Sequence, residues 1–331
     1  MTVRVGVIGT GIMGSDHART LARMVSGAEV GAVFDVDRSR AQAVAGTLPA
    51  ARVLDDPRAL IRDDAVDAVL VASSDPTHEE LVLASIAAGK PVFCEKPLAP
   101  TVAACRHILD AEAAARRRLV SVGFMRRYDP GYVELKRLLD EGLLGPPLLM
   151  HCVHRNPDAP ANVPSSYLIT GSAVHEIDMA RWLFGDEIAT VTVHTGRSSR
   201  ASGSTRDPLL LVLETTGGVL IDVEVFVHAR YGYEVRCELV GEDGTAALDA
   251  PAPTLVRREF AAGRGLAADW RPRFAEAYRR ELQDWIDGLR GAGSAGSPLA
   301  SAHDGYAATA VAEAGIAALQ TGLPQKVELR A

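Results

Sequence analysis

The first third of the chain alternates short apolar runs with helical patterns, and this alternation limits the fold more than any other feature of the sequence. Runs of strand length cover residues 3–8, 29–34, 67–72, 91–94 and 119–122, and helical patterns cover 15–24, 38–45, 77–89 and 101–117. Asp56 before Pro57 marks one more helix start, and Thr77 with Glu80 has the spacing of a capping box. Strands and helices of these lengths form right-handed βαβ units, so we predict a parallel sheet.

The alternation ends near Gly123, and a different pattern follows. Helical patterns cover 130–141, 172–183, 272–289 and 302–319, a strand covers 148–154, and irregular segments cover 155–166 and 291–298. Four or five strand-like runs with glycine turns lie within 188–259 without a long helix between them. This pattern predicts a mostly antiparallel sheet with one covered face. We therefore expect two domains, over 1–123 and 124–331.

Composition limits the partners of the chain. Its 331 residues suffice for about two domains, and 47% apolar with 23% charged residues is ordinary for a globular protein. A formal net charge of -7 argues against nucleic acid and anionic membranes as partners, and no apolar run reaches the ~18 residues of a membrane span. The four cysteines are isolated, which predicts a cytoplasmic location and no cysteine-based metal site: Cys94, Cys105, Cys152 and Cys237.

A glycine motif, Gly9-Thr-Gly11-Ile-Met-Gly14, joins the first strand to the first helix. In a βαβ unit this motif binds dinucleotides: Gly9 allows a tight turn, Gly11 lets the backbone approach a pyrophosphate, and Gly14 lets helix and strand pack closely. Asp35 ends the second strand about 20 residues later, where a carboxylate binds the ribose hydroxyls and repels a 2′-phosphate. We predict NAD over NADP, although Arg38 keeps NADP as an alternative. The competing interpretation is a glycine-rich turn with a surface aspartate.

The fold class expected from these patterns is α/β, with an N-terminal Rossmann domain and a C-terminal α+β domain whose open sheet is mostly antiparallel. Ligands of open parallel sheets lie at the carboxyl ends of the strands, so Ser73 and Ser74 are expected in the cofactor crevice, unless they form a simple turn. The full set of expected cofactor contacts is Gly9, Gly11, Ile12, Met13, Gly14, Asp35, Arg38, Ser73, Ser74, His78, Glu95 and Lys96.

Lys96 lies at the same edge, in Cys94-Glu95-Lys96-Pro97. An ammonium group beside a cationic nicotinamide is disfavoured, so this lysine would exchange a proton with a substrate hydroxyl near neutral pH. The alternative is an ordinary surface lysine at a strand end.

Several further motifs carry a family resemblance. Glu95-Lys96-Pro97 after the glycine motif resembles the signature of the glucose–fructose oxidoreductase / inositol dehydrogenase (Gfo/Idh/MocA) superfamily. The segments 151–157, 174–178, 231–244 and 273–278 resemble the inositol 2-dehydrogenase branch in the same order along the chain. The resemblance implies an NAD(P)-dependent dehydrogenase of a cyclic polyol or sugar, and it implies that the open sheet packs against other subunits in a tetramer or dimer. A metal is not required for such a hydride transfer.

The same resemblance implies roles for individual residues. Lys96 holds the substrate hydroxyl and relays protons, next to a cis Lys–Pro bond, and His175 is the acid/base. The expected substrate contacts are Lys96, His154, Asn156, Gly171, Ser172, His175 and Tyr233. Strand geometry agrees in part, because His154 shares one face with Cys152 and Asn156 while His151 points to the other. The alternatives are a structural His154 and a solvated pair between His175 and Asp178.

One position departs from the family pattern, which commonly has an aspartate four residues before the acid/base histidine. This chain has Gly171 there. Three explanations remain: Thr170, Ser172 or Asp178 orients His175 instead; the vacated volume admits a larger or amino-bearing substrate; or the protein is a weak or inactive NAD(H)-binding sensor. Our hypothesis is the second, so an aminocyclitol or an aminoglycoside sugar of secondary metabolism stands as the alternative to an inositol-like substrate.

Overall fold

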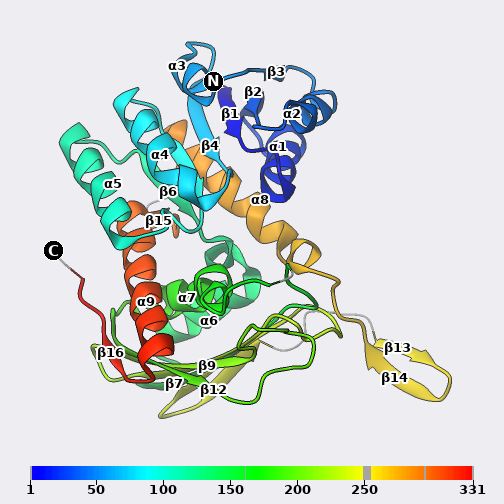
Figure 1. Cartoon of the computed structure of the whole chain (residues 1–331), viewed down its shortest axis with the longest axis vertical. Helices are drawn as coiled ribbons and strands as arrows, with labels where there is room; N and C mark the ends of the chain where they lie inside the picture. The colour runs from blue at the N-terminus through cyan, green and yellow to red at the C-terminus, as the bar shows by residue number, and fades with distance from the viewer. Residues whose placement is uncertain (1, 161, 249–254, 294–295, 330–331) are drawn as a thin grey trace. The chain divides into compact units, whose positions relative to one another are not determined.

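The computed structural model describes residues 2–160, 162–248, 255–293 and 296–329, and their contacts group into two units. The first unit comprises Met1–Tyr128 and Glu276–Thr309, and the second comprises Asp129–Ala275 and Ala310–Ala331. Figure 1 follows the chain by colour from the N-terminus to the C-terminus. Each unit has its own seven-stranded sheet, so we describe the units separately.

The first unit contains the parallel sheet that the sequence predicts. Its strand order is β15-β6-β5-β4-β1-β2-β3, and only β15 runs antiparallel to its neighbour. The strands are β1 (Val3–Ile8), β2 (Ala28–Phe34), β3 (Arg52–Val53), β4 (Ala68–Val71), β5 (Val92–Glu95), β6 (Val120–Gly123) and β15 (Ala300–Ser301). The two-residue strands β3 and β15 are too short for a sequence pattern to reveal. The expected Rossmann architecture is confirmed.

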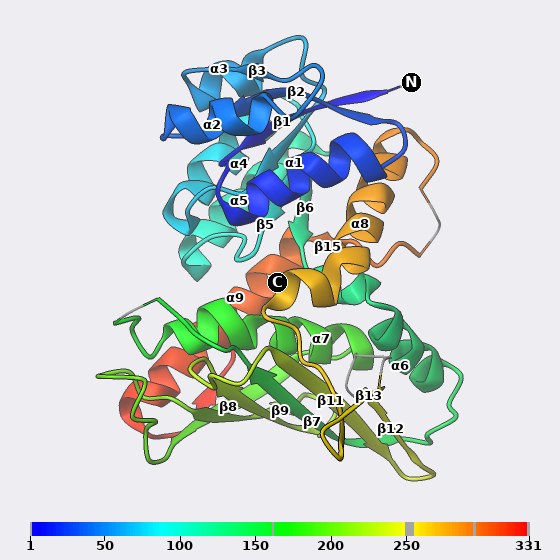
Figure 2. The same cartoon turned by 90° about the vertical axis from the view of Figure 1, so that its right-hand side faces the viewer.

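Helices connect these strands and close the core. They are α1 (Ile12–Met24), α2 (Arg38–Ala45), α3 (Pro57–Arg62), α4 (His78–Ala87) and α5 (Val102–Ala115), with short 3₁₀ turns η1 (Asp75–Thr77) and η2 (Met125–Tyr128). The later helix α8 (Trp270–Leu289) contributes Leu282, Trp285 and Ile286 to the same apolar cluster as Val5 and Leu21. Segments far apart in the sequence therefore share one core, and α1 lies beside α8 in Figure 2.

Side-chain caps start several of these helices, and one expected cap is wrong. Asp37 and Asp56 accept hydrogen bonds from the first backbone N–H groups of α2 and α3, and Thr101 does so for α5. Thr77 makes no such cap for α4. Its hydroxyl group instead bonds to Ser73 and to the carbonyl oxygen of Ser74, because the chain enters α4 through the 3₁₀ turn η1.

The second unit contains the mostly antiparallel sheet, in the order β12-β11-β7-β10-β9-β8-β16, with β7 and β10 as its parallel pair. The strands are β7 (Pro147–Arg155), β8 (Ile188–Thr195), β9 (Leu209–Thr215), β10 (Leu220–Phe226), β11 (Glu234–Gly241), β12 (Thr245–Leu248) and β16 (Gln325–Lys326). The helices α6 (Pro130–Asp140) and α7 (Val174–Phe184) lie on one face of this sheet (Figure 2). The π-helical turn η3 (Leu168–Ala173) leads into α7, and α9 (Ala302–Thr321) spans the end of the first unit and the start of the last segment.

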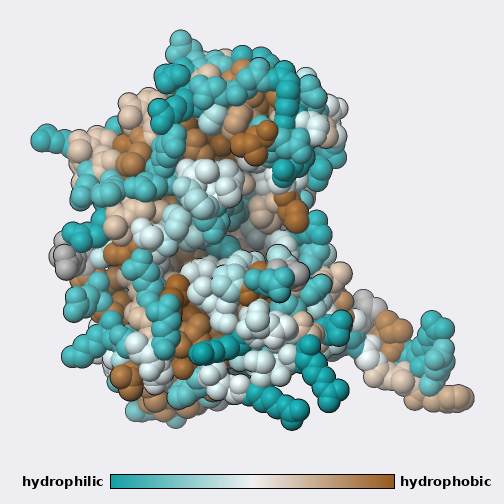
Figure 3. Space-filling model, viewed as in Figure 1, coloured by the Kyte–Doolittle hydropathy of each residue, from teal (hydrophilic) through white to brown (hydrophobic). Residues whose placement is uncertain are grey.

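A hairpin of β13 (Leu255–Arg258) and β14 (Ala261–Arg264) stands away from the rest of the second unit. Every residue of its two strands is exposed, and the turn carries Phe260 fully in solvent. Both hydrophobic and hydrophilic residues lie on this hairpin in Figure 3. Among the helices of the described residues, none combines the length and the apolar character that a membrane span requires.

Candidate functional site

The glycine turn of the first unit has the geometry that its motif predicts. Gly9 has a φ of +90°, and a Cβ atom there would lie 2.5 Å from the carbonyl oxygen of Ala72. A Cβ atom on Gly14 would lie 1.8 Å from the carbonyl oxygen of Gly9, so helix and turn are in direct contact. A Cβ atom on Gly11 would meet nothing within 4 Å. Two glycines therefore serve packing, while Gly11 keeps the start of α1 open to a ligand.

Asp35 fixes this turn from the end of β2. Its Oδ2 accepts hydrogen bonds from the backbone N–H of Thr10 at 2.7 Å and from the Thr10 hydroxyl at 3.0 Å, and its Oδ1 accepts from the N–H of Asp37 at 2.8 Å. The N-terminus of α1 carries no acidic residue and no side-chain cap. Bare N–H groups at a helix start attract a phosphate, so the turn fits the pyrophosphate of a dinucleotide.

A cavity of about 530 Å³ adjoins this turn. Of the expected cofactor contacts, Gly9, Gly11, Asp35, Ser73 and Ser74 line it. Arg38 does not line it, because its guanidinium pairs with Asp55 outside the cavity. Arg40 lines it instead, with Nε 4.0 Å from the Oδ1 of Asp35. Among the residues that line this cavity, Arg40 is the cationic side chain.

His78 is buried and holds two strand-end loops together. Its Nδ1 lies 2.8 Å from the carbonyl oxygen of Pro97, and its Nε2 lies 3.1 Å from that of Ser73. Both ring nitrogens are thus engaged by backbone groups. In this structure His78 positions the loops on either side of it and does not line the cavity.

Lys96 follows β5 and has the cis bond to Pro97 that the resemblance implies. The preceding carboxylate, Glu95, accepts the backbone N–H of Lys96 at 3.2 Å through Oε2, while Oε1 lies 2.5 Å from Nε2 of His17. Burial alone would raise the pKa of Glu95, but the hydrogen bond and the charge of His17, followed by the charge of Lys96, lower it below its usual range. Glu95 is therefore an ionised, buried support for the Lys96 loop.

A cluster of titratable and aromatic side chains lies in the second unit. His154, on the buried face of β7, places Nδ1 3.1 Å from both carboxylate oxygens of Glu176. The ring of His175 lies with its centroid 6.3 Å from that of His154, and the ring of Tyr233 meets His154 edge-on at 6.0 Å. Of the expected substrate contacts, the structure thus brings His154, His175 and Tyr233 together. Asn156 follows two residues after His154, and its backbone bonds to Phe226 and Ala229.

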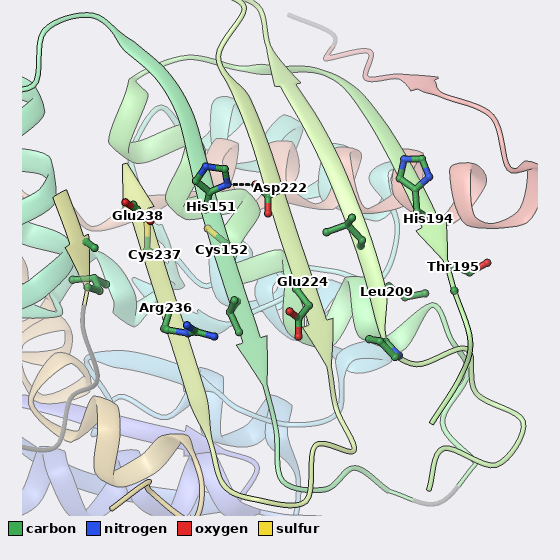
Figure 4. Close-up of a pocket in the computed structure, with 16 residues that line it drawn as sticks. His151, Cys152, His194, Thr195, Leu209, Asp222, Glu224, Arg236, Cys237 and Glu238 are labelled. Carbon is green, nitrogen blue, oxygen red and sulfur yellow. Dashed lines mark hydrogen bonds and ion pairs between the residues drawn. The ribbon is translucent and has the colours of Figure 1, made fainter. Parts of the chain in front are cut away.

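Burial excludes one alternative for these histidines, the solvated pair on a helix surface. His175 and Asp178 are 8% and 1% exposed, so they do not form a solvated pair on a helix surface. His151 points to the opposite face of the sheet, as strand geometry predicts, and bonds to Asp222. Figure 4 shows that open face, where a hollow of about 790 Å³ is lined by charged side chains, among them Glu224 and Arg236.

The expected open volume at Gly171 is absent. Gly171 and the buried Ser172 lie in the π-helical turn η3. A Cβ atom on Gly171 would lie 2.7 Å from Cε2 and 2.8 Å from Cζ of Tyr167. The aromatic ring of Tyr167 fills the space that the missing side chain leaves, so this glycine does not enlarge a pocket.

Sequence reasoning missed His17, Arg40, Tyr167 and Glu176. Glu176 had a signal, since it directly follows His175 inside an apolar helix where an acidic residue needs a partner. His17 and Tyr167 had none, because their partners lie in other elements or depend on the π turn.

Two family models match the chain. The model described as "Oxidoreductase family, NAD-binding Rossmann fold" matches residues 3–124, and that of the "GFO/IDH/MocA C-terminal domain" matches residues 132–247. Full-length relatives are similar as well. "Inositol 2-dehydrogenase 1" of Saccharopolyspora erythraea is 56% identical over 99% of this chain and 97% of its own length, and "Inositol 2-dehydrogenase" of Paracoccus denitrificans is 49% identical over 97% and 95%.

A solved structure is similar along the whole chain. The crystal structure of myo-inositol dehydrogenase from Lactobacillus casei, in complex with NAD(H) and myo-inositol, superposes with a TM-score of 0.95 and 36% sequence identity. The match covers 100% of this chain and 98% of that one.

Proposed function

Since the chain belongs to the GFO/IDH/MocA family of oxidoreductases, with its NAD-binding Rossmann fold, we propose that it oxidises a secondary hydroxyl group of a cyclic polyol such as myo-inositol with NAD. The observation that carries this proposal is similarity along the full length, at 56% identity, to an inositol 2-dehydrogenase. The likeness to the L. casei enzyme with NAD(H) and myo-inositol supports the same reaction class.

NAD, when bound, accepts the hydride that leaves the carbinol carbon. The residues of the first unit bind and orient it: the turn at Gly9, Gly11 and Gly14 receives the pyrophosphate, and the carboxylate of Asp35 receives the ribose hydroxyls. A carboxylate at that position repels a 2′-phosphate, which favours NAD over NADP. We assign cofactor binding to residues 1–123, and substrate binding and oligomerisation to 124–331, although residues 276–309 of this second part pack with the first unit.

The chemistry is assigned to three side chains. The ammonium group of Lys96 holds the oxygen of the reacting hydroxyl, and His175 takes up its proton. The hydrogen bond from Nδ1 of His154 to Glu176 fixes the tautomer of His154, so its Nε2 accepts from a second substrate hydroxyl. Asn156, Ser172 and Tyr233 complete the proposed substrate contacts.

The two other functions have less support. The amino-bearing substrate depended on open volume at Gly171, and the ring of Tyr167 fills that volume. A catalytically silent sensor would not need the arrangement of His154, His175 and Glu176. The comparisons support neither of them.

We also propose a cytoplasmic homo-oligomer, a tetramer or a dimer. The four cysteines are buried and form no disulfide, which fits a reducing compartment. The uncovered sheet face of Figure 4 and the exposed β13–β14 hairpin offer surfaces for a second copy. Analytical ultracentrifugation at several concentrations tests this, and a monomer throughout would contradict it.

NADH absorbance tests the function, with saturating NAD and a panel of myo-inositol, scyllo-inositol, an aminocyclitol and glucose. We expect turnover with an inositol to exceed that with the aminocyclitol. Lys96→Ala should abolish turnover and leave NAD affinity nearly unchanged, as measured by fluorescence titration. An inactive wild type that still binds NAD tightly would favour the sensor instead.

A further inference from the structure

The parallel strands β7 and β10 continue to pair beyond their ends, but in an irregular way. The backbone N–H of Asn156 donates to the carbonyl oxygen of Phe226 at 2.9 Å, and the carbonyl oxygen of Asn156 accepts the N–H of Ala229 at 3.0 Å. In a regular parallel ladder the two partners of one residue lie two positions apart, whereas these lie three apart. The chain after β10 therefore carries one extra residue opposite Asn156, as in a β-bulge. Bulges redirect side chains and are frequent next to active sites.

The carboxylate of Asp207 holds the backbone inside this bulge. Its Oδ1 accepts the N–H of Val227 at 3.1 Å. Its Oδ2 accepts the N–H of His228 at 3.1 Å and lies 2.6 Å from Nδ1 of the same histidine. Val227 and His228 are both buried, so their N–H groups need an acceptor within the protein. Asp207 supplies it for both.

The segment that carries Asp207 also holds a second part of the same unit. Asp207 is 0% exposed, and a carboxylate is costly to bury unless donors surround it, as they do here. The hydroxyl group of Thr205 donates to the carbonyl oxygen of Val163 at 2.7 Å, and the N–H of Arg206 donates to the hydroxyl oxygen of Ser165 at 2.8 Å. Three successive residues thus brace the chain after β7 and the chain before η3.

We propose that Asp207 is a positioning residue of the polyol site that acts through Asn156. The inference rests on the proposed function, which assigns a substrate hydroxyl to Asn156. The carboxylate fixes the bulge, and the bulge fixes the backbone of Asn156 on both of its sides. The side chain of Asn156 is then held on the strand face that it shares with His154. Asp207 supports Asn156 from the start of β9 in the way that Glu176 supports His154 from α7.

Variants of the whole enzyme test this inference with myo-inositol as the probe. Asp207→Asn keeps the size of the side chain but replaces one carboxylate oxygen with an NH₂ group, so at least one of the three donors loses its acceptor. The KM should rise about tenfold while kcat changes less than about threefold, because the hydroxyl group that Asn156 binds is not the one oxidised. In the Asn156→Ala background, Asp207→Asn should add less than about twofold to the KM.

His228→Leu is a milder second variant. It removes the ring donor and leaves both backbone hydrogen bonds to Asp207 in place. If the carboxylate acts through the backbone, the KM of His228→Leu should rise less than about threefold.

The matched control is Asp186→Asn. The carboxylate of Asp186 also holds backbone N–H groups, those of Gly217 at 2.7 Å and Glu187 at 2.9 Å, and Gly217 lies in the turn at the other end of the β9–β10 pair. Asp186→Asn should leave the KM for myo-inositol within about twofold of the wild type. Hydrogen exchange gives a readout without substrate: the amide of Asn156 should exchange faster in Asp207→Asn and at the wild-type rate in Asp186→Asn.

The outcomes distinguish the two proposals. A wild type that oxidises no cyclic polyol contradicts the proposed function, and the exchange rate of the Asn156 amide still tests its link to Asp207. With an active wild type, an unchanged KM or an unchanged exchange rate in Asp207→Asn contradicts this inference alone. Equal increases of the KM in Asp207→Asn and Asp186→Asn would show general destabilisation of the sheet. A larger increase in His228→Leu than in Asp207→Asn would assign the effect to the imidazole, and it would also overturn the inference.

Discussion

The imidazole of His17 and the carboxylate of Glu95 form a buried hydrogen bond, Nε2 to Oε1 at 2.5 Å, between residues 78 positions apart. The pair joins helix α1, which begins at the glycine turn, to the loop that carries Lys96. The second carboxylate oxygen of Glu95 accepts a hydrogen bond from the backbone N–H of Lys96. The cofactor turn and the proposed catalytic lysine are thereby connected through one charged, buried contact.

Removing His17 is expected to destabilise the fold. His17→Leu leaves Glu95 ionised and buried without this donor, which costs on the order of 3–5 kcal/mol in the free energy of unfolding. His17→Gln keeps an amide donor and should recover much of that loss. Urea denaturation of both variants measures the difference, and equal losses would show that the hydrogen bond is not the stabilising element.

The same pair makes the free energy of unfolding depend on pH. The pKa of Glu95 in the folded state lies below its ordinary value of 4.5, so its contribution is present above that value and is lost as the pH falls through the folded pKa. We expect Glu95→Gln to flatten the decline in unfolding free energy at acid pH. The hydrogen bond with Arg137 also lowers the pKa of Glu134, but this pair lies on the exposed surface where solvent screens it, so the comparison variant Glu134→Gln should flatten the decline less. An identical acid decline in wild type and Glu95→Gln would disprove the assignment.

Two glycines of the turn are expected to have different roles, Gly14 in folding and Gly11 in cofactor binding. Gly14→Ala places a Cβ atom 1.8 Å from a backbone oxygen and should lower the melting temperature, because neither backbone can yield. Gly11→Ala meets nothing within 4 Å and should melt within a few degrees of wild type, yet weaken NAD binding about tenfold or more. Differential scanning fluorimetry and a binding titration measure the two effects. A destabilised Gly11→Ala that binds NAD normally would reverse the assignment.

Asp35 is expected to set the preference for NAD. In Asp35→Ser the repulsion of a 2′-phosphate disappears while Arg40 remains on the cavity wall, so the ratio of kcat/KM for NAD over NADP should fall about tenfold or more. The ratio is the correct readout, because losing the bonds to Thr10 affects both cofactors alike. Thr101→Ala, which removes the side-chain cap of α5 and lies outside the cavity lining, should keep the ratio unchanged.

Glu176 is expected to act through His154. Glu176→Gln offers a donor as well as an acceptor to Nδ1, so the tautomer of His154 is no longer fixed and kcat/KM for myo-inositol should fall about tenfold. The affinity for NAD should not change. Glu187→Gln, in the connection between α7 and β8, breaks the ion pair with Arg181 of α7 and serves as the comparison. If both variants lose activity equally, Glu176 has only a structural role.

Much of the fold was predictable because its signals are local. The apolar runs of β1, β2, β4, β5 and β6 and the glycine motif between β1 and α1 define the first unit from sequence alone. Boundaries were less accurate where exposure breaks the pattern: α1 begins at Ile12 and not near Ser15, because Ile12 is 60% exposed and the amphipathic pattern starts later.

The candidate site was predictable only in part. His154, His175 and Tyr233 were identified and do lie together, because strand period and helix position are readable from sequence. The occupant of the space at Gly171 was not readable, since it depends on a π turn that moves Tyr167 onto the glycine. Likewise, the sequence pointed to Arg38, but Arg40 lines the cavity, because Arg38 pairs with Asp55, which is distant in sequence.

The cofactor unit is made of two separate stretches of chain, with α8 residues Leu282, Trp285 and Ile286 in its core. A ribosome adds residues from the N-terminus onward, so the βαβ half is synthesised long before the helix that seals it. The apolar surface of this half stays uncovered until nearly the whole polypeptide has emerged. During synthesis the nucleotide-binding half is thus the first part made and among the last to be completed. A gene fragment that ends at Gly123 encodes this sheet without the α8 residues, Trp285 among them, that complete its core.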